Sequence, residues 1–380
     1  MKFAFCLYKY FPYGGLQRDF IRIARECLAR GHEVRVFVLT WHGPIPDDIA
    51  DVTFVPVSAV FNHNKYQLFT EWVMTALERD PVDCVVGFNK MPGLDIYYAA
   101  DSCFEEKART QRGPHYKLLP RYHHFSDYER AVFGAGSRTE IMIISEAQRP
   151  FFEKHYGTQP ERMHILPPGI SRDRIAPPDA KDIRARKRAE LGLGDDDRLI
   201  LFVGSGFIKK GLKRAILAVD SLPRSMKKRT RFLVIGEDKS GQFVRLIRRL
   251  GLQKTISIIG GSDDVPGYLL AGDLLLHPAS DENAGMVLLE AMVAGLPVLA
   301  TDICGYGHYV VEADMGDLVE SPFRQETLNR KLLTMLEHED REKWIINGRR
   351  FAESADIYSL PQKATDIIEA VTAKRCQQAA

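Results

Sequence analysis

The stretch 274–298 places an apolar run, a polar loop, an amphipathic segment and a second apolar run in direct succession. The loop 277–285 closes on Gly285, and the amphipathic segment ends at Gly295. Strand, loop, helix and strand in this order predict a βαβ unit, whose ligands bind where the loop meets the helix N-terminus. Free backbone N–H groups at that terminus attract anions, so we expect an anionic ligand at this loop.

Two glutamates flank the expected helix N-terminus. Glu282 lies in the loop, and Glu290 lies eight residues later in the helical segment. Carboxylates placed in this way could hold hydroxyl groups at both ends of a molecule whose centre is a diphosphate, as in a nucleotide sugar. The alternative is that Glu282 only complements the helix dipole and that Glu290 faces solvent. Glu290 lies beside the apolar residues Leu288, Leu289 and Met292. A carboxylate beside an apolar stripe needs a polar partner, which favours a role for Glu290 in ligand binding.

The spacing Glu282-x7-Glu290, followed by Ala-x-x-Ala-Gly-x-Pro-Val at 291–298, resembles the retaining glycosyltransferases of the GT-B fold in sequence family four. The stretches 4–20 and 86–95 are similar to the lipopolysaccharide core heptose glucosyltransferases within that family. The resemblance extends from about residue 3 to about residue 370. It implies an α/β fold of two Rossmann-like, doubly wound parallel-sheet domains that face each other across a cleft.

The resemblance also implies an activity. A member of this family would transfer a hexose from a UDP-sugar, with UDP-glucose as the expected donor, to the inner-core heptose of lipopolysaccharide with retention of configuration. No metal or other cofactor is implied, and the acidic run 195–197 precedes an expected strand, as is typical of a solvated turn. UDP-galactose or a UDP-N-acetylhexosamine remains an alternative donor. A UDP-sugar epimerase and a non-catalytic, membrane-bound nucleotide-sugar sensor remain alternative functions.

The length of the chain and one Pro- and Gly-containing stretch predict two domains. A chain of 380 residues exceeds the usual size of one hydrophobic core. The Pro- and Gly-containing stretch 165–170 predicts the boundary. We expect an acceptor-side domain over 1–168 and a nucleotide-sugar domain over 169–355. By resemblance, residues 356–380 return to the first domain, with a helical stretch at 356–372 that Pro361 interrupts.

Short apolar runs alternate with helical patterns along the whole chain, which predicts parallel sheets. In the first domain we expect strands at 3–8, 33–39, 53–57, 83–88 and 141–144. In the second we expect strands at 199–203, 232–235, 256–259, 273–276 and 297–300.

Composition restricts the cellular setting and the partners. A net charge of +2 gives no reason to expect a nucleic acid partner. Six cysteines without a Cys-x-x-Cys spacing are typical of reduced core residues in a cytoplasmic protein. The sequence has neither a signal-peptide pattern nor an apolar run long enough to cross a bilayer, so we expect any membrane contact to be peripheral.

Four residues of the first domain are candidate ligand contacts. Gly14 and Gly15 lie between the first expected strand and helix, and by resemblance their backbone faces the donor diphosphate; a tight turn is the alternative. Asp19, one turn further, could touch the donor or only favour the helix dipole. By resemblance, Asp101 meets the outer hydroxyls of the donor sugar.

The second domain supplies the remaining candidates for donor binding. Lys209 and Lys210 enter a helix after a glycine-rich loop and could neutralise the leaving diphosphate, although a solvated lysine pair is the alternative. The family commonly has Arg at the first position, so Lys209 would lack a bidentate contact. Gly260 and Gly261 are candidates for the uracil site. The loop before the helix would offer its backbone to the diphosphate through Asn283, Ala284, Gly285 and Met286, with Glu290 on the ribose.

Basic and aromatic residues interleave over 104–133, a pattern that suits the anionic surface of the inner membrane. The alternative is an amphipathic helix docked on its own domain. We expect peripheral attachment to the cytoplasmic face of the membrane. The candidate membrane and acceptor contacts are Lys107, Arg109, Arg112, Lys117, Arg121 and Tyr122.

Overall fold

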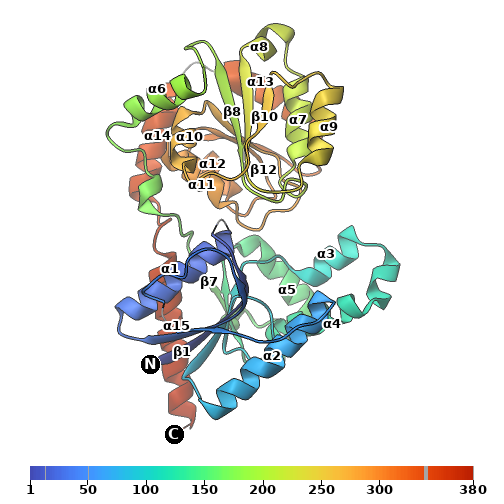
Figure 1. Cartoon of the computed structure of the whole chain (residues 1–380), viewed down its shortest axis with the longest axis vertical. Helices are drawn as coiled ribbons and strands as arrows, with labels where there is room; N and C mark the ends of the chain where they lie inside the picture. The colour runs from blue at the N-terminus through green and yellow to red at the C-terminus, as the bar shows by residue number, and fades with distance from the viewer. Residues whose placement is uncertain (13, 50, 338–340, 380) are drawn as a thin grey trace. The chain divides into compact units, whose positions relative to one another are not determined.

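The computed structural model of the chain describes residues 1–12, 14–49, 51–337 and 341–379. It divides into two compact units of similar construction (Figure 1). Unit 1 comprises Met1–Gly169 together with Tyr358–Ala380, and unit 2 comprises Ile170–Ile357. Each unit is built on its own parallel sheet, as expected for an α/β fold of two doubly wound domains.

The sheet of unit 1 contains the five strands expected there and two more. Its order is β3 (Val52–Phe54), β2 (Glu33–Trp41), β1 (Lys2–Tyr10), β4 (Cys84–Gly87), β5 (Ile96–Ala99), β6 (Glu140–Ile143) and β7 (Met163–Ile165). All neighbouring strands are parallel. β5 and β7, runs of four and three residues, were not predicted from the sequence.

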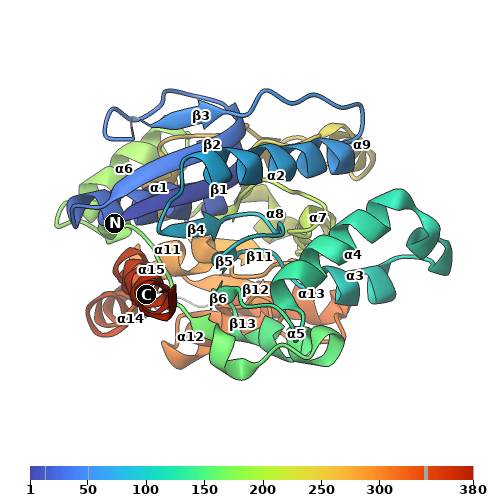
Figure 2. The same ribbon diagram turned by 90° about the horizontal axis from the view of Figure 1, so that it is seen from below.

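Helices cover both faces of the unit 1 sheet (Figure 2). One face carries α1 (Gly15–Ala29) and α15 (Leu360–Ala379). The other carries α2 (Asn62–Arg79), α4 (Pro120–Phe133) and α5 (Arg149–Tyr156), whose apolar side chains join those of the strands in one core. The segment 104–118 extends from this second face as α3 (Phe104–Gln111) and a 3₁₀ turn, Pro114–Leu118.

The last helix corrects one prediction. Pro361 does not interrupt a helix over 356–372; instead it is the second residue of α15, which runs from Leu360 to Ala379. A proline in the first turn costs no hydrogen bond, because N–H groups there have no intrahelical acceptor. α15 packs along α1, and Arg30, the residue after α1, forms ion pairs with Asp366 (2.8 Å) and Glu369 (2.9 Å).

The sheet of unit 2 has six parallel strands, of which five were expected. Its order is β10 (Ile256–Ile258), β9 (Thr230–Ile235), β8 (Arg198–Val203), β11 (Leu274–His277), β12 (Val298–Thr301) and β13 (Gly316–Val319). The central strands β8 and β11 are neighbours, although a long stretch of chain separates them. Their carboxyl ends therefore bring two distant loops together.

The helices of unit 2 also form two layers (Figure 1). One layer contains α7 (Leu212–Asp220), α9 (Gly241–Arg249) and α13 (Gln325–Glu337), which share a core with the strands. The other contains α6 (Ala180–Glu190), α10 (Val265–Ala271), α11 (Met286–Val293), α12 (Gly307–Glu312) and α14 (Arg341–Ser354). The short helix α8 (Arg224–Lys228) connects α7 to β9.

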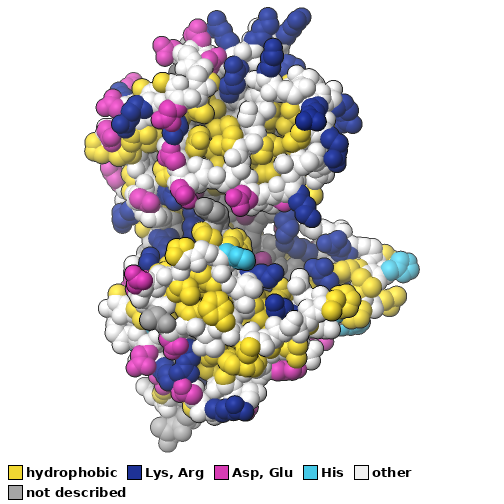
Figure 3. Space-filling model, in the orientation of Figure 1, with side chains coloured by type: hydrophobic (Ala, Val, Ile, Leu, Met, Phe, Trp, Pro, Cys, Tyr) yellow, Lys and Arg dark blue, Asp and Glu magenta, His cyan; other side chains and the backbone are white. Residues whose placement is uncertain are grey.

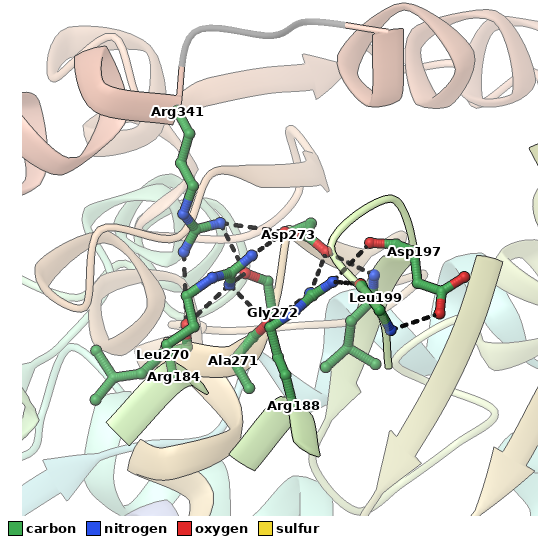
Figure 4. A network of polar contacts seen from close by, with 10 residues as sticks. Arg184, Arg188, Asp197, Leu199, Leu270, Ala271, Gly272, Asp273 and Arg341 are labelled. Carbon is green, nitrogen blue, oxygen red and sulfur yellow. Dashed lines mark hydrogen bonds and ion pairs between the residues drawn. The ribbon is translucent and has the colours of Figure 1, made fainter. Parts of the chain in front are cut away.

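A cluster of charges, of which Arg188 is buried and the others are half-buried, lies at the amino end of β11 (Figure 4). The Asp273 carboxylate accepts from Arg184 (2.5 Å) and Arg188 (3.0 Å), and Arg341 lies 3.3 Å away. Arg184 also donates to the last carbonyl groups of α10. The cluster joins α6 and α14 to the turn that leads into β11, the strand that ends at the candidate site.

Candidate functional site

The candidate site is built where β8 and β11 end. The loop after β8 carries Lys210, and the loop after β11 carries Glu282. Lys210 Nζ lies 2.5 Å from Glu282 Oε2. The structure therefore brings together two of the residues that the sequence predicted, although they lie far apart in the chain.

Two glycines permit this approach. An added Cβ at Gly211, whose φ is +76°, would lie 1.9 Å from the carbonyl oxygen of Pro278. An added Cβ at Gly204 would lie 2.8 Å from Lys210 Cε, so the lysine stem lies directly over this glycine. Backbone hydrogen bonds then join the loops: the Ser280 N–H donates to the Lys209 carbonyl oxygen at 2.6 Å. The side chains of Lys210 and Glu282 are thus positioned by two loops docked on each other.

His277 lies at the floor of the site and was not assigned a role from the sequence. It ends β11 fully buried, with its ring 6.2 Å from that of Phe202. Its Nε2 atom lies 3.4 Å from Glu282 Oε2. Burial lowers the pKa of His277, which favours the neutral imidazole, and neither ring nitrogen forms a hydrogen bond with a residue that the structure describes. The signal in the sequence was a polar residue that ends an apolar strand run.

The charges at the site keep Glu282 ionised. Burial alone would raise the pKa of its carboxyl, but the contact with His277 and the Lys210 ammonium outweigh burial and lower that pKa to about 2. The side chain of Glu282 is 17% exposed, so it remains accessible to a ligand. Burial raises the pKa of neighbouring Cys304 to about 12, which keeps this thiol protonated and unreactive.

Lys209 differs from Lys210 in its surroundings. Its side chain is 68% exposed, and its ammonium lies 3.6 Å from Asp281. The backbone of Lys209 is better fixed than its side chain, because its carbonyl oxygen accepts from Ser280. The two lysines therefore do not form an equivalent pair.

The loop before α11 is held mainly through its backbone. Gly285 precedes the helix with φ at +90°, which an L-residue rarely adopts. The Ala284 carbonyl oxygen accepts from the Tyr306 N–H at 2.9 Å. Asn283 and Met286 flank this segment and are half-buried. Glu290 is buried on α11, so it does not face solvent.

The two glycines proposed for the base site lie beyond β10, on the same edge of the sheet. The Gly260 carbonyl oxygen accepts a hydrogen bond from the Gly236 N–H at 2.7 Å. A Cβ at Gly261 would lie 3.2 Å from the Glu237 side chain. The structure places both near the carboxyl end of β9, and their contact with a base stays a prediction.

The candidates in unit 1 lie between β1 and the first turns of α1, and just after β5. Gly14 precedes α1, and Gly15 is its first residue. Asp19 is 3% exposed, and its carboxylate accepts from the Tyr98 hydroxyl at 2.6 Å. Asp101 is exposed just after β5. A ligand role for these four residues stays a prediction.

The basic residues of 104–133 are partly neutralised within the segment. The Glu105 carboxylate accepts from Arg109 (2.6 Å) and Tyr122 (2.7 Å), and Lys117 lies 3.4 Å from it. The guanidinium groups of Arg112 and Arg121 lie 5.5 and 5.6 Å from the ring centroids of Tyr116 and Phe125. Lys107 is half-buried on α3.

The same segment exposes apolar side chains. Leu118 is 76% exposed and Leu119 is 48% exposed, at the turn between the 3₁₀ segment and α4. Within the described part of the chain, no helix is both long and apolar enough to cross a membrane. Nor do any three His, Cys, Asp or Glu side chains of those residues converge as a metal site would require.

Comparisons with known proteins agree with this geometry. The family "Glycosyltransferase Family 4" matches residues 13–174, and "Glycosyl transferases group 1" matches residues 183–351. The lipopolysaccharide glucosyltransferase WaaG of Escherichia coli (strain K12) is 46% identical over 366 residues, covering 96% of this chain and 98% of that protein. The chain belongs to the WaaG family of glycosyltransferases.

Solved structures show the same relationship at the level of the fold. A crystal structure of WaaG has a TM-score of 0.92 and 46% identity, and the alignment covers 96% of this chain and 99% of that one. Anabaena HepE in complex with UDP-glucose has a TM-score of 0.75 at 18% identity over 97% of this chain and all of its own, which shows a shared fold.

Proposed function

We propose that the chain transfers a hexose, with glucose as the expected sugar, from a UDP-sugar to an inner-core heptose of lipopolysaccharide. The bond between the anomeric carbon and the β-phosphate oxygen breaks, and a bond from that carbon to a heptose hydroxyl oxygen forms. The hydroxyl proton moves to a phosphate oxygen of the departing UDP. Attack from the face of the leaving group retains the α configuration.

The Lys210–Glu282 pair is the observation that carries this proposal. Lys210 supplies a fixed positive charge where negative charge develops on the diphosphate, while ionised Glu282 accepts hydrogen bonds from sugar hydroxyls. Lys209, whose side chain is exposed, adds a second positive charge. The backbone of 283–286 would bind the diphosphate and Glu290 the ribose. In unit 1, Gly14, Gly15, Asp19 and Asp101 remain the proposed donor contacts.

The first test is UDP release by Glu282→Ala, measured in metal-free buffer with UDP-glucose and a heptose-bearing core acceptor. We expect kcat to fall about 10²- to 10³-fold, the usual cost of removing one preorganised group from a transition state. Glu326→Ala, at an exposed glutamate on α13, is the matched control and should keep the activity of the unaltered enzyme. Normal turnover by Glu282→Ala, with its folding checked by thermal unfolding, would contradict the proposal.

The same assay separates the alternatives. A panel of UDP-sugars identifies the donor, because acceptor-dependent release should occur from one sugar. A UDP-sugar epimerase would isomerise the sugar without acceptor. A nucleotide-sugar sensor would bind UDP-sugar and membrane without turnover.

We also propose peripheral attachment to the anionic cytoplasmic face of the inner membrane through residues 104–133. Exposed Leu118 and Leu119 could enter the head-group region, while Arg112 and Arg121 remain close to lipid phosphates. The internal pairing of Arg109 and Lys117 with Glu105 reduces the free charge of this segment. Apolar insertion would therefore contribute more to its attachment than charge.

A further inference from the structure

Basic side chains are concentrated at the end of unit 2 opposite the candidate site. Residues 221–256 contain ten Lys and Arg residues but only two acidic residues, although the whole chain has a net charge of +2. The two acids, Glu237 and Asp238, follow β9 at the carboxyl ends of the strands. At the opposite edge, the amino ends of β9 and β10 carry mostly basic side chains, and the acidic run 195–197 lies beside them at the start of β8.

The topology gathers six of these bases at the amino ends of β9 and β10. α8 and Arg229 lead directly into β9, and the end of α9 leads through Lys254 into β10. β9 and β10 are parallel neighbours, and the Phe232 N–H donates to the Thr255 carbonyl oxygen at 2.8 Å. We name this surface the basic pole and define it as Arg224, Lys228, Arg229, Arg248, Arg249 and Lys254, all exposed.

The charges of the basic pole have few partners inside the protein. Arg229 lies 3.4 Å from Asp196, an exposed contact that contributes little. The other five form no ion pair with any residue that the structure describes. Figure 3 shows Lys and Arg side chains gathered over the end of unit 2 that carries α8 in Figure 1. Favourable helix-dipole contacts account for Arg248 and Arg249 at the end of α9, but not for Arg224 at the start of α8.

We infer that the basic pole binds the anionic surface of a phospholipid bilayer by electrostatic attraction alone. No large apolar side chain is exposed among residues 221–258, so the surface lacks the apolar anchors on which protein interfaces depend. Unpaired, flexible cations match a fluid layer of phosphate groups, each contributing to attraction within a Debye length. This inference rests on the proposed function in one respect, because a lipid-borne acceptor places the enzyme at such a surface.

The test compares two tandem arginine pairs in the full-length protein. Arg248→Glu with Arg249→Glu alters the basic pole on α9, and Arg349→Glu with Arg350→Glu makes the same charge change at exposed positions on α14. Binding to sedimented vesicles of phosphatidylcholine, with and without phosphatidylglycerol, is measured at low and high salt. On the anionic vesicles we expect the first pair to weaken binding at least about 25-fold at low salt, from about fivefold per charge removed, and the control pair to weaken it much less.

Other outcomes would overturn the inference. Equal loss from both arginine pairs would show a response to net charge, and no loss would leave the basic pole without this role. Equal binding to neutral vesicles, or equal or tighter binding to a duplex DNA probe at the same salt, would contradict attraction to anionic lipid. A Leu118→Asp, Leu119→Asp variant measures the separate contribution of unit 1.

Activity distinguishes this inference from the proposed reaction. The Arg248→Glu, Arg249→Glu variant should release UDP at the unaltered rate with a soluble, lipid-free core acceptor, because the basic pole lies at the opposite edge of the sheet from Lys210 and Glu282. Loss of that rate would contradict a role confined to membrane binding. Absence of acceptor-dependent turnover in the unaltered enzyme would refute the proposed function and leave the vesicle result intact.

Discussion

Lys210 and Glu282 are each proposed to contact a different part of the donor, yet in this structure they contact each other at 2.5 Å. A diphosphate would compete with Glu282 for the ammonium, so donor binding must redistribute the hydrogen bonds of this pair. His277 Nε2 lies 3.4 Å from the same carboxylate oxygen but forms no hydrogen bond with any residue that the structure describes. Glu282 would therefore exchange the Lys210 ammonium for hydroxyl groups of the donor sugar when the lysine turns to phosphate.

The lowered pKa of Glu282 predicts a pH dependence of stability. The carboxyl has a pKa of about 2 in the fold against an ordinary 4.5, so its stabilising effect is complete above pH 4.5 and is lost as the pH falls toward 2. Between about pH 6 and pH 4, the difference in unfolding free energy between unaltered protein and Glu282→Gln should shrink by about 1 kcal/mol. Urea unfolding at each pH measures it, with Glu326→Gln as control; parallel curves for all three proteins would contradict the lowered pKa.

At the scale of elements, the position of the site depends on how β11 is anchored at its other end. Asp273 accepts from the Leu199 N–H of β8 at 2.7 Å as well as from the arginines of α6. One carboxylate therefore aligns the two strands whose loops carry Lys210 and Glu282. Three guanidinium groups surround the one carboxylate of Asp273, and burial and the nearby Arg184 lower the pKa of Arg341 to about 10.

Because positive charge is in excess in this cluster, removing the carboxylate should lower the free energy of unfolding more than removing one guanidinium group. Asp273→Asn should destabilise the protein by about 3–5 kcal/mol, because it leaves the buried Arg188 and two half-buried guanidinium groups without a counter-charge. Arg341→Gln should cost about 1 kcal/mol, since it loses hydrogen bonds but relieves repulsion. Urea unfolding of both variants tests the comparison. An equal or larger cost for Arg341→Gln would show that Asp273 is not the centre of the cluster.

At the scale of the whole molecule, the two ends of the chain meet in unit 1. α15 packs on α1 and buries Ala364 and Ile368, while Arg375 forms an ion pair with Asp95. Unit 2 is thus inserted between two segments of unit 1. Unit 1 therefore cannot complete its fold until the last helix is available.

A truncation tests this dependence. A chain ending at Ile357 lacks α15 and should lose hydrogen-exchange protection in α1 and β4, because their apolar faces become exposed. Protection in unit 2 should remain. A chain ending at Arg375 keeps most of α15 and serves as the control. Full protection of α1 in the shorter truncation would contradict the dependence.

The sequence alone determined the class of fold and several members of the site. Alternating apolar runs and helical segments predicted ten of the strands, and the βαβ pattern at 274–298 placed Glu282 at a strand end. These inferences succeed because burial imposes its period on each strand and helix locally. The family resemblance added the reaction, which periodicity does not encode.

Only the tertiary structure decided which of these residues meet. Lys210 and Glu282 are paired because β8 and β11 are neighbours, and strand order is a long-range property that no local pattern carries. The path of the loop after β11, which periodicity does not encode, brings His277 to 3.4 Å from Glu282. Pro361 was misread because its effect depends on where the helix begins. Charge and hydrophobic periodicity can be read from the sequence, whereas the contact partner of each side chain depends on tertiary packing.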